Sequence, residues 1–220
     1  MRKVYIGHEL KSRCPKLRLG CIEASVVVAG TGDELLSEIK ERLALIQREL
    51  TIEEISKIPP IEASRKAYKA CGKDPARYRL SAEALLRRVV SGKGLYQINN
   101  VVDQLNLVSV TSGFSIGGYD CDKVQESIIF GIGLADEPYA GIGRGELNIE
   151  NLPVFRDESG AFGTPTSDSQ RTEVGNDTTR FLMVLIDFGS SDQLEPAMEL
   201  AVRLLKEYCQ ATYVEQYNII

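Results

Sequence analysis

The sequence predicts an α+β fold, in which helices pack outside a mainly antiparallel or mixed sheet. Apolar residues recur at helical spacing in the first half of the chain, whereas short β-branched runs dominate the second half. Because the two kinds of element are segregated, an alternating parallel β-α-β arrangement is not favoured. With 220 residues, 43% of them hydrophobic, and no low-complexity linker or internal repeat, we expect one domain over residues 1–220.

The first fifty residues are expected to contain two strands and a long helix. Partial alternation over Val4–Glu9 indicates a short strand, and the β-branched apolar run Leu19–Ala29 indicates a buried one. Apolar residues then recur every three or four positions across Asp33–Leu50, which is typical of an amphipathic helix. Thr31 or Asp33 is expected to cap this helix, since a side-chain oxygen can accept from its first free backbone N–H groups.

Three more helices are expected before the middle of the chain. Glu62–Cys71 follows two prolines, and Ser81–Val90 begins with a serine suited to capping. Asn100–Val110 begins with an asparagine suited to capping and is stopped by Gly113. Residues 114–120 are expected to form an apolar loop.

The second half is expected to be rich in strands. A hairpin is indicated where two short apolar runs flank a polar turn that contains glycine. The last helix is expected to be capped by Ser191 or Asp192 and to end near Gln210. The expected strands are Ser127–Leu134, Leu152–Arg156, Ala161–Gly163 and Arg180–Phe188.

Charge and hydropathy limit the classes of partner. The formal net charge of −5 argues against a broadly basic nucleic-acid-binding coat, although it leaves room for a local basic patch. No run approaches the roughly 18 apolar residues that a membrane span needs. The N-terminal residues lack the apolar centre of a signal peptide. We therefore expect a cytoplasmic protein with no membrane partner and no DNA partner.

The residues that most often hold metals and cofactors are sparse. The five cysteines are odd in number and form no CxxC pair, so we expect buried thiols rather than disulfides or zinc ligands. His8 is the only histidine and lies in an expected strand, which argues against a histidine-based triad. The sequence GIGRG at Gly141–Gly145 does not match the dinucleotide-binding GxGxxG pattern. We expect neither a metal nor a cofactor.

Two polar stretches are candidates for a site. Ile98–Asp120 combines a helix cap, a helix and a glycine-rich end, and Gly163–Asp177 is dense in hydroxyl groups. Hydroxyls and backbone amides can stabilise an oxyanion, and a carboxylate such as Asp168 can orient or activate water. The guanidinium of Arg171 can bind a phosphate or a carboxylate. An ordinary surface loop is the alternative interpretation of the second stretch.

Three segments together resemble the B3/B4 domain of the phenylalanyl-tRNA synthetase beta chain, and more closely its freestanding relatives. They are YKACGKDPARYRLSAEALLRR at Tyr68–Arg88, INNVVD and GGYD within Ile98–Asp120, and DESGAFG, SDSQRTEV and DTTRFLMVLID within Asp157–Asp187. The resemblance is strongest over residues 66–189. It implies an α+β fold with a pocket between its lobes. In the synthetase this domain hydrolyses tyrosine wrongly attached to the phenylalanine tRNA, without ATP or metal, so the implied partner is a tRNA or the 3′ end of an aminoacyl-tRNA.

The resemblance also implies roles for individual residues. The family often has PLHAFD where this chain has SIGGYD, so its pocket histidine falls on Gly117. Asp168 is the expected water-orienting residue, and the backbone amides near Gly117–Gly118 or Ser167–Ser169 are expected to hold the oxyanion. Other substrate contacts are expected from Arg171 and from Asn99 and Asn100 near the 3′ end. Arg87 and Arg88 are expected to face tRNA phosphates.

Structural alternatives exist for the same residues. Asn100 and Asp103 also suit helix capping, Arg87 and Arg88 also suit an exposed helix face, and Arg171 also suits an ion pair with Glu173 or Asp168. Three functions remain open. They are a freestanding factor that hydrolyses mischarged aminoacyl-tRNA in trans, a non-catalytic module that binds RNA, an amino acid or a protein, and a small-molecule hydrolase without an RNA partner.

Overall fold

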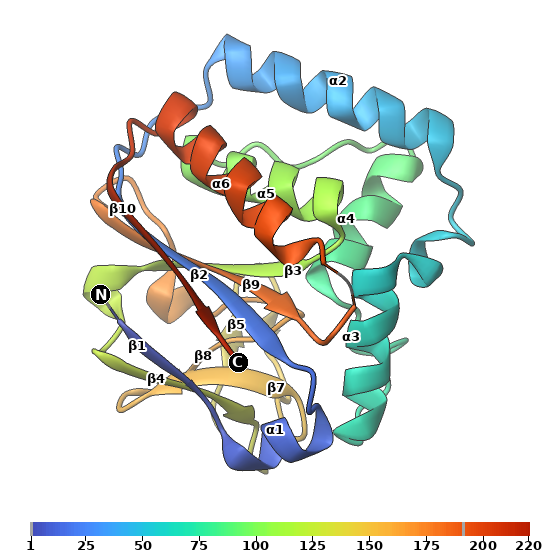
Figure 1. The fold of residues 1–220 in the computed structure, drawn as a ribbon, viewed down its shortest axis with the longest axis vertical. Coiled ribbons are helices and arrows are strands. Elements are labelled where there is room, and N and C mark those ends of the chain that lie inside the picture. Colours follow the sequence, from blue (N-terminus) through green and yellow to red (C-terminus); the bar gives the residue numbers. More distant parts are fainter. Residues whose placement is uncertain (1, 191) are drawn as a thin grey trace.

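The computed structural model describes residues 2–190 and 192–220 and has an α+β fold, which confirms the predicted class. Figure 1 shows α5 and α6 side by side on one side of a sheet, with α2 lying across them. The helices are α1 (His8–Arg13), α2 (Asp33–Glu49), α3 (Pro59–Ala70), α4 (Ser81–Val90), α5 (Asn100–Ser112) and α6 (Leu194–Tyr208), with short 3-10 turns η1 (Ile55–Lys57), η2 (Cys121–Lys123) and η3 (Gln170–Thr172). No helix of the described residues is long and apolar enough to cross a membrane.

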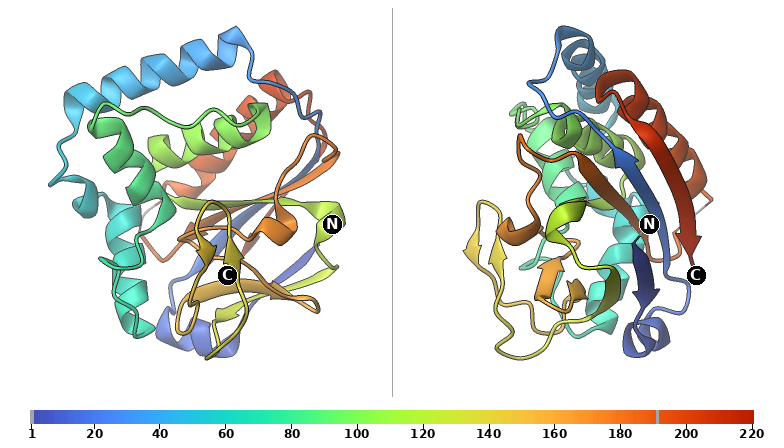
Figure 2. Two further views of the ribbon diagram at one scale, coloured as in Figure 1. Left: turned by 180° about the vertical axis from the view of Figure 1, so that it is seen from behind. Right: turned by 90° about the vertical axis from the view of Figure 1, so that its left-hand side faces the viewer.

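Two four-stranded sheets form the centre of the molecule. One has the order β10-β2-β9-β3 and is antiparallel throughout, and the other has the order β1-β4-β7-β8, with β1 parallel to β4. A two-stranded hairpin, β5–β6, lies on the side of the molecule opposite β10 (Figure 2). The strands are β1 (Lys3–Ile6), β2 (Arg18–Ser25), β3 (Ser115–Asp120), β4 (Ser127–Ile132), β5 (Ala140–Gly141), β6 (Gly145–Glu146), β7 (Pro153–Asp157), β8 (Gly160–Gly163), β9 (Arg180–Asp187) and β10 (Thr212–Ile219).

The central strand β9 divides the core. Successive side chains of a strand point to opposite faces. Phe181, Met183 and Leu185 therefore pack against α5 and α6, whereas the intervening residues pack between the two sheets, with aromatic rings from β3, β4, β7 and β8. This double burial explains why the sequence of β9 is almost continuously apolar. A third cluster joins α3 and α4 to the loops beside the second sheet.

Several local predictions are wrong. His8 lies in α1 rather than in a strand, because β1 ends at Ile6 and the chain turns into a short helix that buries Leu10. Residues 115–120 form the strand β3 rather than a loop, since they pair with β9 over their whole length. The strand β10 was not predicted, because it is an exposed edge strand whose polar residues obscure its pattern.

Helix capping also differs from the predictions, although Gly113 ends α5 at a φ of 79° as expected. The N-cap of α2 is Gly32 and that of α4 is Leu80, each without a side-chain cap, and α6 begins after Gln193 rather than after Asp192. The prediction for Ser191 lies outside the described residues. In α5 the capping side chain is that of Asn99, which accepts from the Val102 N–H at 2.9 Å, rather than that of the following residue.

Candidate functional site

The structure brings together the ends of the two polar stretches. The Gly118 N–H on β3 donates to Oδ2 of Asp168 at 3.2 Å. Asp168 belongs to the loop between β8 and β9, and this loop is fixed at its centre because the Ser169 N–H donates to the Phe162 carbonyl at 2.8 Å. The two polar stretches therefore meet in one region, which contains Gly117, Gly118 and residues 167–171.

The space beside Gly117, where the family resemblance leads us to expect a histidine, is filled by a neighbouring side chain. A Cβ atom at Gly117 would lie 2.0 Å from the Tyr119 hydroxyl oxygen, and a Cβ at Gly163 would lie 2.1 Å from the same oxygen. The Tyr119 ring is fully buried and packs edge-on against Phe162, with ring centroids 4.9 Å apart. No side chain at position 117 fits unless Tyr119 moves.

The carboxyl group of Asp168 is the unusual electrostatic feature of this region. Its Oδ1 is buried and has no hydrogen-bond partner among the residues that the structure describes. Burial raises the pKa of Asp168 to about 7, against the opposing effects of the Gly118 N–H and the Tyr119 hydroxyl. The hydroxyl lies close to the carboxyl but forms no well-aligned hydrogen bond with it. A pKa in this range allows Asp168 to take up and release a proton near neutral pH, as suits a general base.

Three of the amide groups expected to form an oxyanion hole already have acceptors inside the protein. The Gly118 N–H binds Asp168, the Ser167 N–H donates to Oγ1 of Thr164 at 3.0 Å, and the Ser169 N–H is held by β8. The Ser169 hydroxyl accepts from the Arg171 N–H at 3.2 Å and thereby caps η3. An oxyanion would have to displace one of these contacts.

Arg171 is held by the β7–β8 hairpin. Its guanidinium donates to both carboxylate oxygens of Asp157, at 2.8 and 3.2 Å, and to the Gly160 carbonyl at 3.1 Å. The expected ion pair with Glu173 or Asp168 is therefore wrong: Asp157, whose side chain is fully buried, is the partner. This pairing neutralises the charge that a ligand phosphate would need.

A cavity of about 760 Å³ opens beside this region. Ser169 and Arg171 contribute to its wall, but Asp168 does not. Tyr139 also lines it and donates to the Ser167 carbonyl at 2.6 Å, which ties the wall to the Asp168 loop. We call it the acidic cavity, because against one arginine its lining includes the carboxylates of Asp136, Glu137 and Glu146.

Asn99 and Asn100 lie outside this region. The side-chain oxygen of Asn100 accepts from the Ala29 N–H at 2.9 Å, and its nitrogen donates to the carbonyls of Val27 and Tyr208 at 3.0 and 2.9 Å. These bonds join the start of α5 to the ends of β2 and α6. Asn99 and Asn100 are both buried, so in this structure their amides serve as internal links rather than as pocket groups.

The side chains of Arg87 and Arg88 on α4 also contact other residues of the protein. Arg87 donates to the buried Glu83 at 3.0 Å, and Glu83 also accepts from Arg65 at 2.8 Å. Arg88 lies over the ring of Tyr96, 3.9 Å from its centroid. Neither arginine contributes to the wall of the acidic cavity.

Sequence reasoning missed the two tyrosines that shape the region, Tyr119 and Tyr139. Tyr119 is the tyrosine of GGYD, and the two glycines before it are the sequence feature that could have indicated a closely packed ring. The contact of its hydroxyl with Gly163 could not have been predicted, because Gly163 is distant in the sequence. All five cysteines are free and buried, as predicted. Among the described residues, no group of three or more histidine, cysteine, aspartate or glutamate side chains is arranged to hold a metal ion.

Comparisons with known proteins connect this fold to one family. The family model described as "B3/4 domain" matches residues 63–210. Among solved structures, the chain is similar to an N-terminal fragment of the phenylalanyl-tRNA synthetase beta-subunit from Pyrococcus horikoshii, with 14% identity and a TM-score of 0.52. That match covers 99% of this chain and 51% of the other, so the chain spans about half the length of that fragment. No curated protein matches the sequence. Since the family model covers well over half of its residues, the chain belongs to the B3/4 domain family.

Proposed function

We propose that this protein is a cytoplasmic factor that binds the aminoacylated 3′ end of a tRNA and hydrolyses wrongly attached amino acids in trans. The observation that supports hydrolysis most is the buried Asp168 carboxyl, which has a pKa raised to about 7 and one oxygen without a partner among the described residues. Strongly shifted groups of this kind gather at functional sites. The likeness to a synthetase beta-subunit fragment supports a tRNA-linked substrate.

The acidic cavity suits the amino-acid part of such a substrate. An aminoacyl ester carries an α-amino group that is at least partly protonated near neutral pH. Of the three carboxylates in the lining, Glu137 is paired with Arg156 at 2.6 Å, whereas no ion pair involves Asp136 or Glu146 among the described residues. A volume of about 760 Å³ accommodates an amino acid together with a terminal nucleoside.

In the proposed reaction, water attacks the ester carbonyl and transfers a proton to ionised Asp168. The tetrahedral intermediate then breaks its bond to the ribose oxygen, and Asp168 returns the proton to that oxygen, which gives the free amino acid and a tRNA with a 3′-terminal hydroxyl. No covalent nucleophile is proposed, since no histidine partners a serine or cysteine in this region. Asp168 is half-buried and does not line the acidic cavity, whereas the adjacent Ser169 does. Hydrolysis therefore requires a local shift of the loop over residues 164–172, so that the carboxyl meets the bound ester.

A non-catalytic binding module is the second candidate. Two observations favour it: Gly117 provides no histidine, and the amides of Gly118, Ser167 and Ser169 already have acceptors. In that case the domain would hold the aminoacylated end without breaking the ester.

The decisive experiment incubates the purified protein with a panel of mischarged tRNAs and follows the release of amino acid. Hydrolysis of at least one of them, with loss of activity in Asp168→Asn, would support the editing function. The matched control is Asp177→Asn, which changes an exposed aspartate of the same loop region. No release above blank for any tRNA, together with tight binding that Asp168→Asn leaves unchanged, would replace hydrolysis by the binding function.

A further inference from the structure

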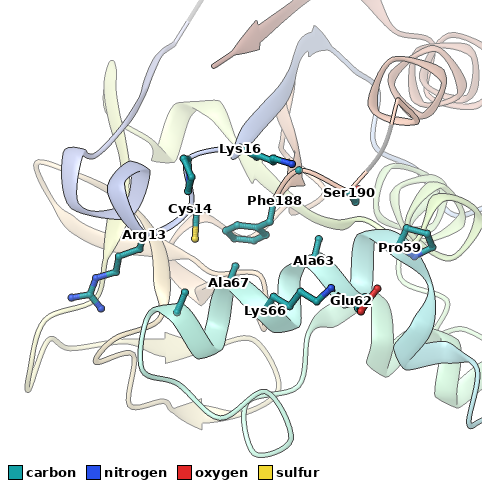
Figure 3. A pocket seen from close by; sticks show the side chains of 13 residues that line it. Arg13, Cys14, Lys16, Pro59, Glu62, Ala63, Lys66, Ala67, Phe188 and Ser190 are labelled. Carbon is teal, nitrogen blue, oxygen red and sulfur yellow. Dashed lines mark ion pairs between the residues drawn. The ribbon is translucent and has the colours of Figure 1, made fainter.

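A second cavity, of about 360 Å³, lies on another part of the molecule, between the loop that follows α1, the side of α3 and the turn after β9. Figure 3 shows the ring of Phe188 and the methyl groups of Ala63 and Ala67 facing this space. Arg13, Lys16 and Lys66 stand around it, and Glu62 is the acidic residue of the lining. We call it the basic cavity. An apolar floor with a positive rim suits a ligand that carries both a ring and an anionic group.

The positive charge extends beyond the cavity itself. Residues 11–18 and 65–79 contain ten lysines and arginines and one aspartate, so these two segments have a net charge of +9. The whole chain has −5, which leaves −14 for the remaining residues. Four of these cations are paired with acidic residues outside the two segments, Arg13 with Glu9, Arg18 with Asp187, Arg65 with Glu83 and Lys66 with Glu62. The other six still leave the segments positive, and phosphate groups are the common target of such surfaces.

Lys16 is positioned by a close contact between two loops. Gly189 has a φ of 88°, and a Cβ atom there would lie 2.3 Å from the Cβ of Lys16. The turn is fixed by Asp187, whose Oδ1 accepts from the backbone N–H groups of Gly189 and Ser190 at 2.9 and 2.8 Å. Lys16 is exposed and makes no ion pair among residues 2–190 and 192–220, so its ammonium group is available to a ligand.

Lys66 stands across the cavity from Lys16 and can exchange its partner. Its ammonium group lies 2.8 Å from Glu62, with side-chain exposures of 71% and 51% (Figure 3). A pair this exposed contributes little free energy, so a phosphate can replace the carboxylate. Arg13, in contrast, is held by Glu9 at 2.6 Å and by the Cys71 carbonyl at 3.2 Å, and it adds to the field without being free to move.

We propose that the basic cavity binds one nucleotide of a single-stranded RNA segment, with its phosphate between Lys16 and Lys66 and its ring over the apolar floor. This inference rests on the proposed function, because it names the surface that would hold the tRNA strand. A neighbouring cavity of about 420 Å³ shares Lys16 and Gly189, and its lining adds Lys11, Arg18 and Asp192. Because Arg18 is paired with Asp187 at 2.7 Å, Lys11 is the residue that extends the positive surface beyond one nucleotide.

The same path leads toward the acidic cavity. The basic segment 65–79 begins at the basic cavity with Lys66. Farther along it, Lys73 donates to the carbonyl of Glu150, two residues from Asn148 in the lining of the acidic cavity. An RNA strand anchored at the basic cavity can follow this segment, and the proposed function places its 3′ end at the acidic cavity because the aminoacyl ester would bind there. The phosphates would then lie on the positive surface, and the aminoacyl group with its protonated amine would lie in the acidic cavity.

The test measures the fluorescence anisotropy of a labelled single-stranded RNA octamer that ends in CCA. Lys16→Glu combined with Lys66→Glu is expected to weaken binding by at least tenfold. It is also expected to lower the slope of log affinity against log salt by about 0.7, which corresponds to the loss of the one phosphate contact that the two lysines share. The matched control combines Lys40→Glu with Lys206→Glu, which makes the same charge change at exposed lysines of α2 and α6. It is expected to stay within twofold of the wild type.

Each of the other possible outcomes decides a different claim. Equal weakening by both double variants would show a net-charge effect and overturn the site. Binding by the wild type that neither double variant changes would also overturn the site, while RNA binding itself would stand. Absence of octamer binding by the wild type in low salt would overturn the proposal, even if mischarged tRNA is hydrolysed. Weakening that is specific to the Lys16 and Lys66 variant, without hydrolysis of any mischarged tRNA, would support the site and contradict only the catalytic part of the proposed function.

Discussion

The hydroxyl of Tyr119 occupies the space in which a side chain at Gly117 would begin, 2.0 Å from the position of the missing Cβ. The two residues are therefore coupled, because a side chain at position 117 and the hydroxyl of Tyr119 would compete for the same space. A substitution at Gly117 alone cannot restore a histidine to the site, since the ring of Tyr119 lies in its way. The same hydroxyl stands beside Asp168, so this pair also affects the electrostatics of the candidate site.

The coupling predicts a non-additive effect on stability. Gly117→Ala is expected to lower the free energy of unfolding by about 1–3 kcal/mol, because it overpacks a closed core. Tyr119→Phe removes the closest atom and leaves the next one at 2.5 Å, so the penalty of Gly117→Ala should be smaller in that background. Urea denaturation of the two single variants and the double variant measures the coupling. Strictly additive effects would contradict the contact.

Asp168 predicts a pH dependence of stability. Burial raises its pKa to about 7, whereas an unfolded aspartate titrates near 3.9. The folded state therefore holds the proton more tightly, and stability falls as pH rises from about 4 to 7. Relative to Asp168→Asn, the wild type should lose stability over this window, by up to about 4 kcal/mol for the full pKa difference. Urea denaturation of both proteins at pH 4, 5.5 and 7 checks this. Parallel curves across the window would contradict the raised pKa.

Asn100 is predicted to act on stability rather than on ligand binding. Asn100→Ala removes the partners of two N–H groups and two carbonyls, so it should lower the free energy of unfolding by roughly 2–4 kcal/mol. The RNA affinity of the fraction that remains folded should be unchanged. Denaturation and anisotropy measurements on the same preparation separate the two effects. Native stability combined with lost RNA binding would instead support the role at the 3′ end that the family resemblance implies.

The pair of Arg171 and Asp157 is predicted to hold the loop of the candidate site. Asp157→Asn leaves a guanidinium without its buried counter-charge and should destabilise the protein by about 3–5 kcal/mol. Glu173→Gln is the matched control, since this exposed carboxylate lies two residues from Arg171 and forms no ion pair with it among the described residues. Thermal unfolding distinguishes the two. Equal effects would contradict the assigned pairing.

Much of the fold was predictable because its signals are local. The helix over Ser81–Val90 and the hairpin around Asp157–Gly160 follow from apolar spacing and turn residues that lie next to one another in the chain. The strand β3 was mistaken for a loop because its two glycines lack the side chains that indicate a strand. Their fit becomes visible only when β9 and Tyr119 are in place.

The candidate site was predictable only in part, for a similar reason. The two polar stretches were expected to contribute to one site, and the structure brings them together where the Gly118 N–H donates to Asp168. The partners of Arg171 and Asn100, in contrast, come from distant parts of the chain, and no local pattern indicates which of several acceptors will lie within reach. The charge of the basic cavity depends on the same kind of long-range assembly, since Lys16 and Lys66 become neighbours only through the turn at Gly189.

The most direct test of the central claim is the pH profile of deacylation under single-turnover conditions. A mischarged tRNA that the protein hydrolyses serves as the substrate. The rate of amino-acid release is measured from pH 5.5 to 8.5 and corrected for the uncatalysed reaction. If Asp168 is the base, the rate should rise about tenfold per pH unit below 7 and level off above it. Asp177→Asn should keep this profile, and Asp168→Asn should abolish the enzymatic rate. An unchanged profile in Asp168→Asn, or no release at any pH, would contradict the account.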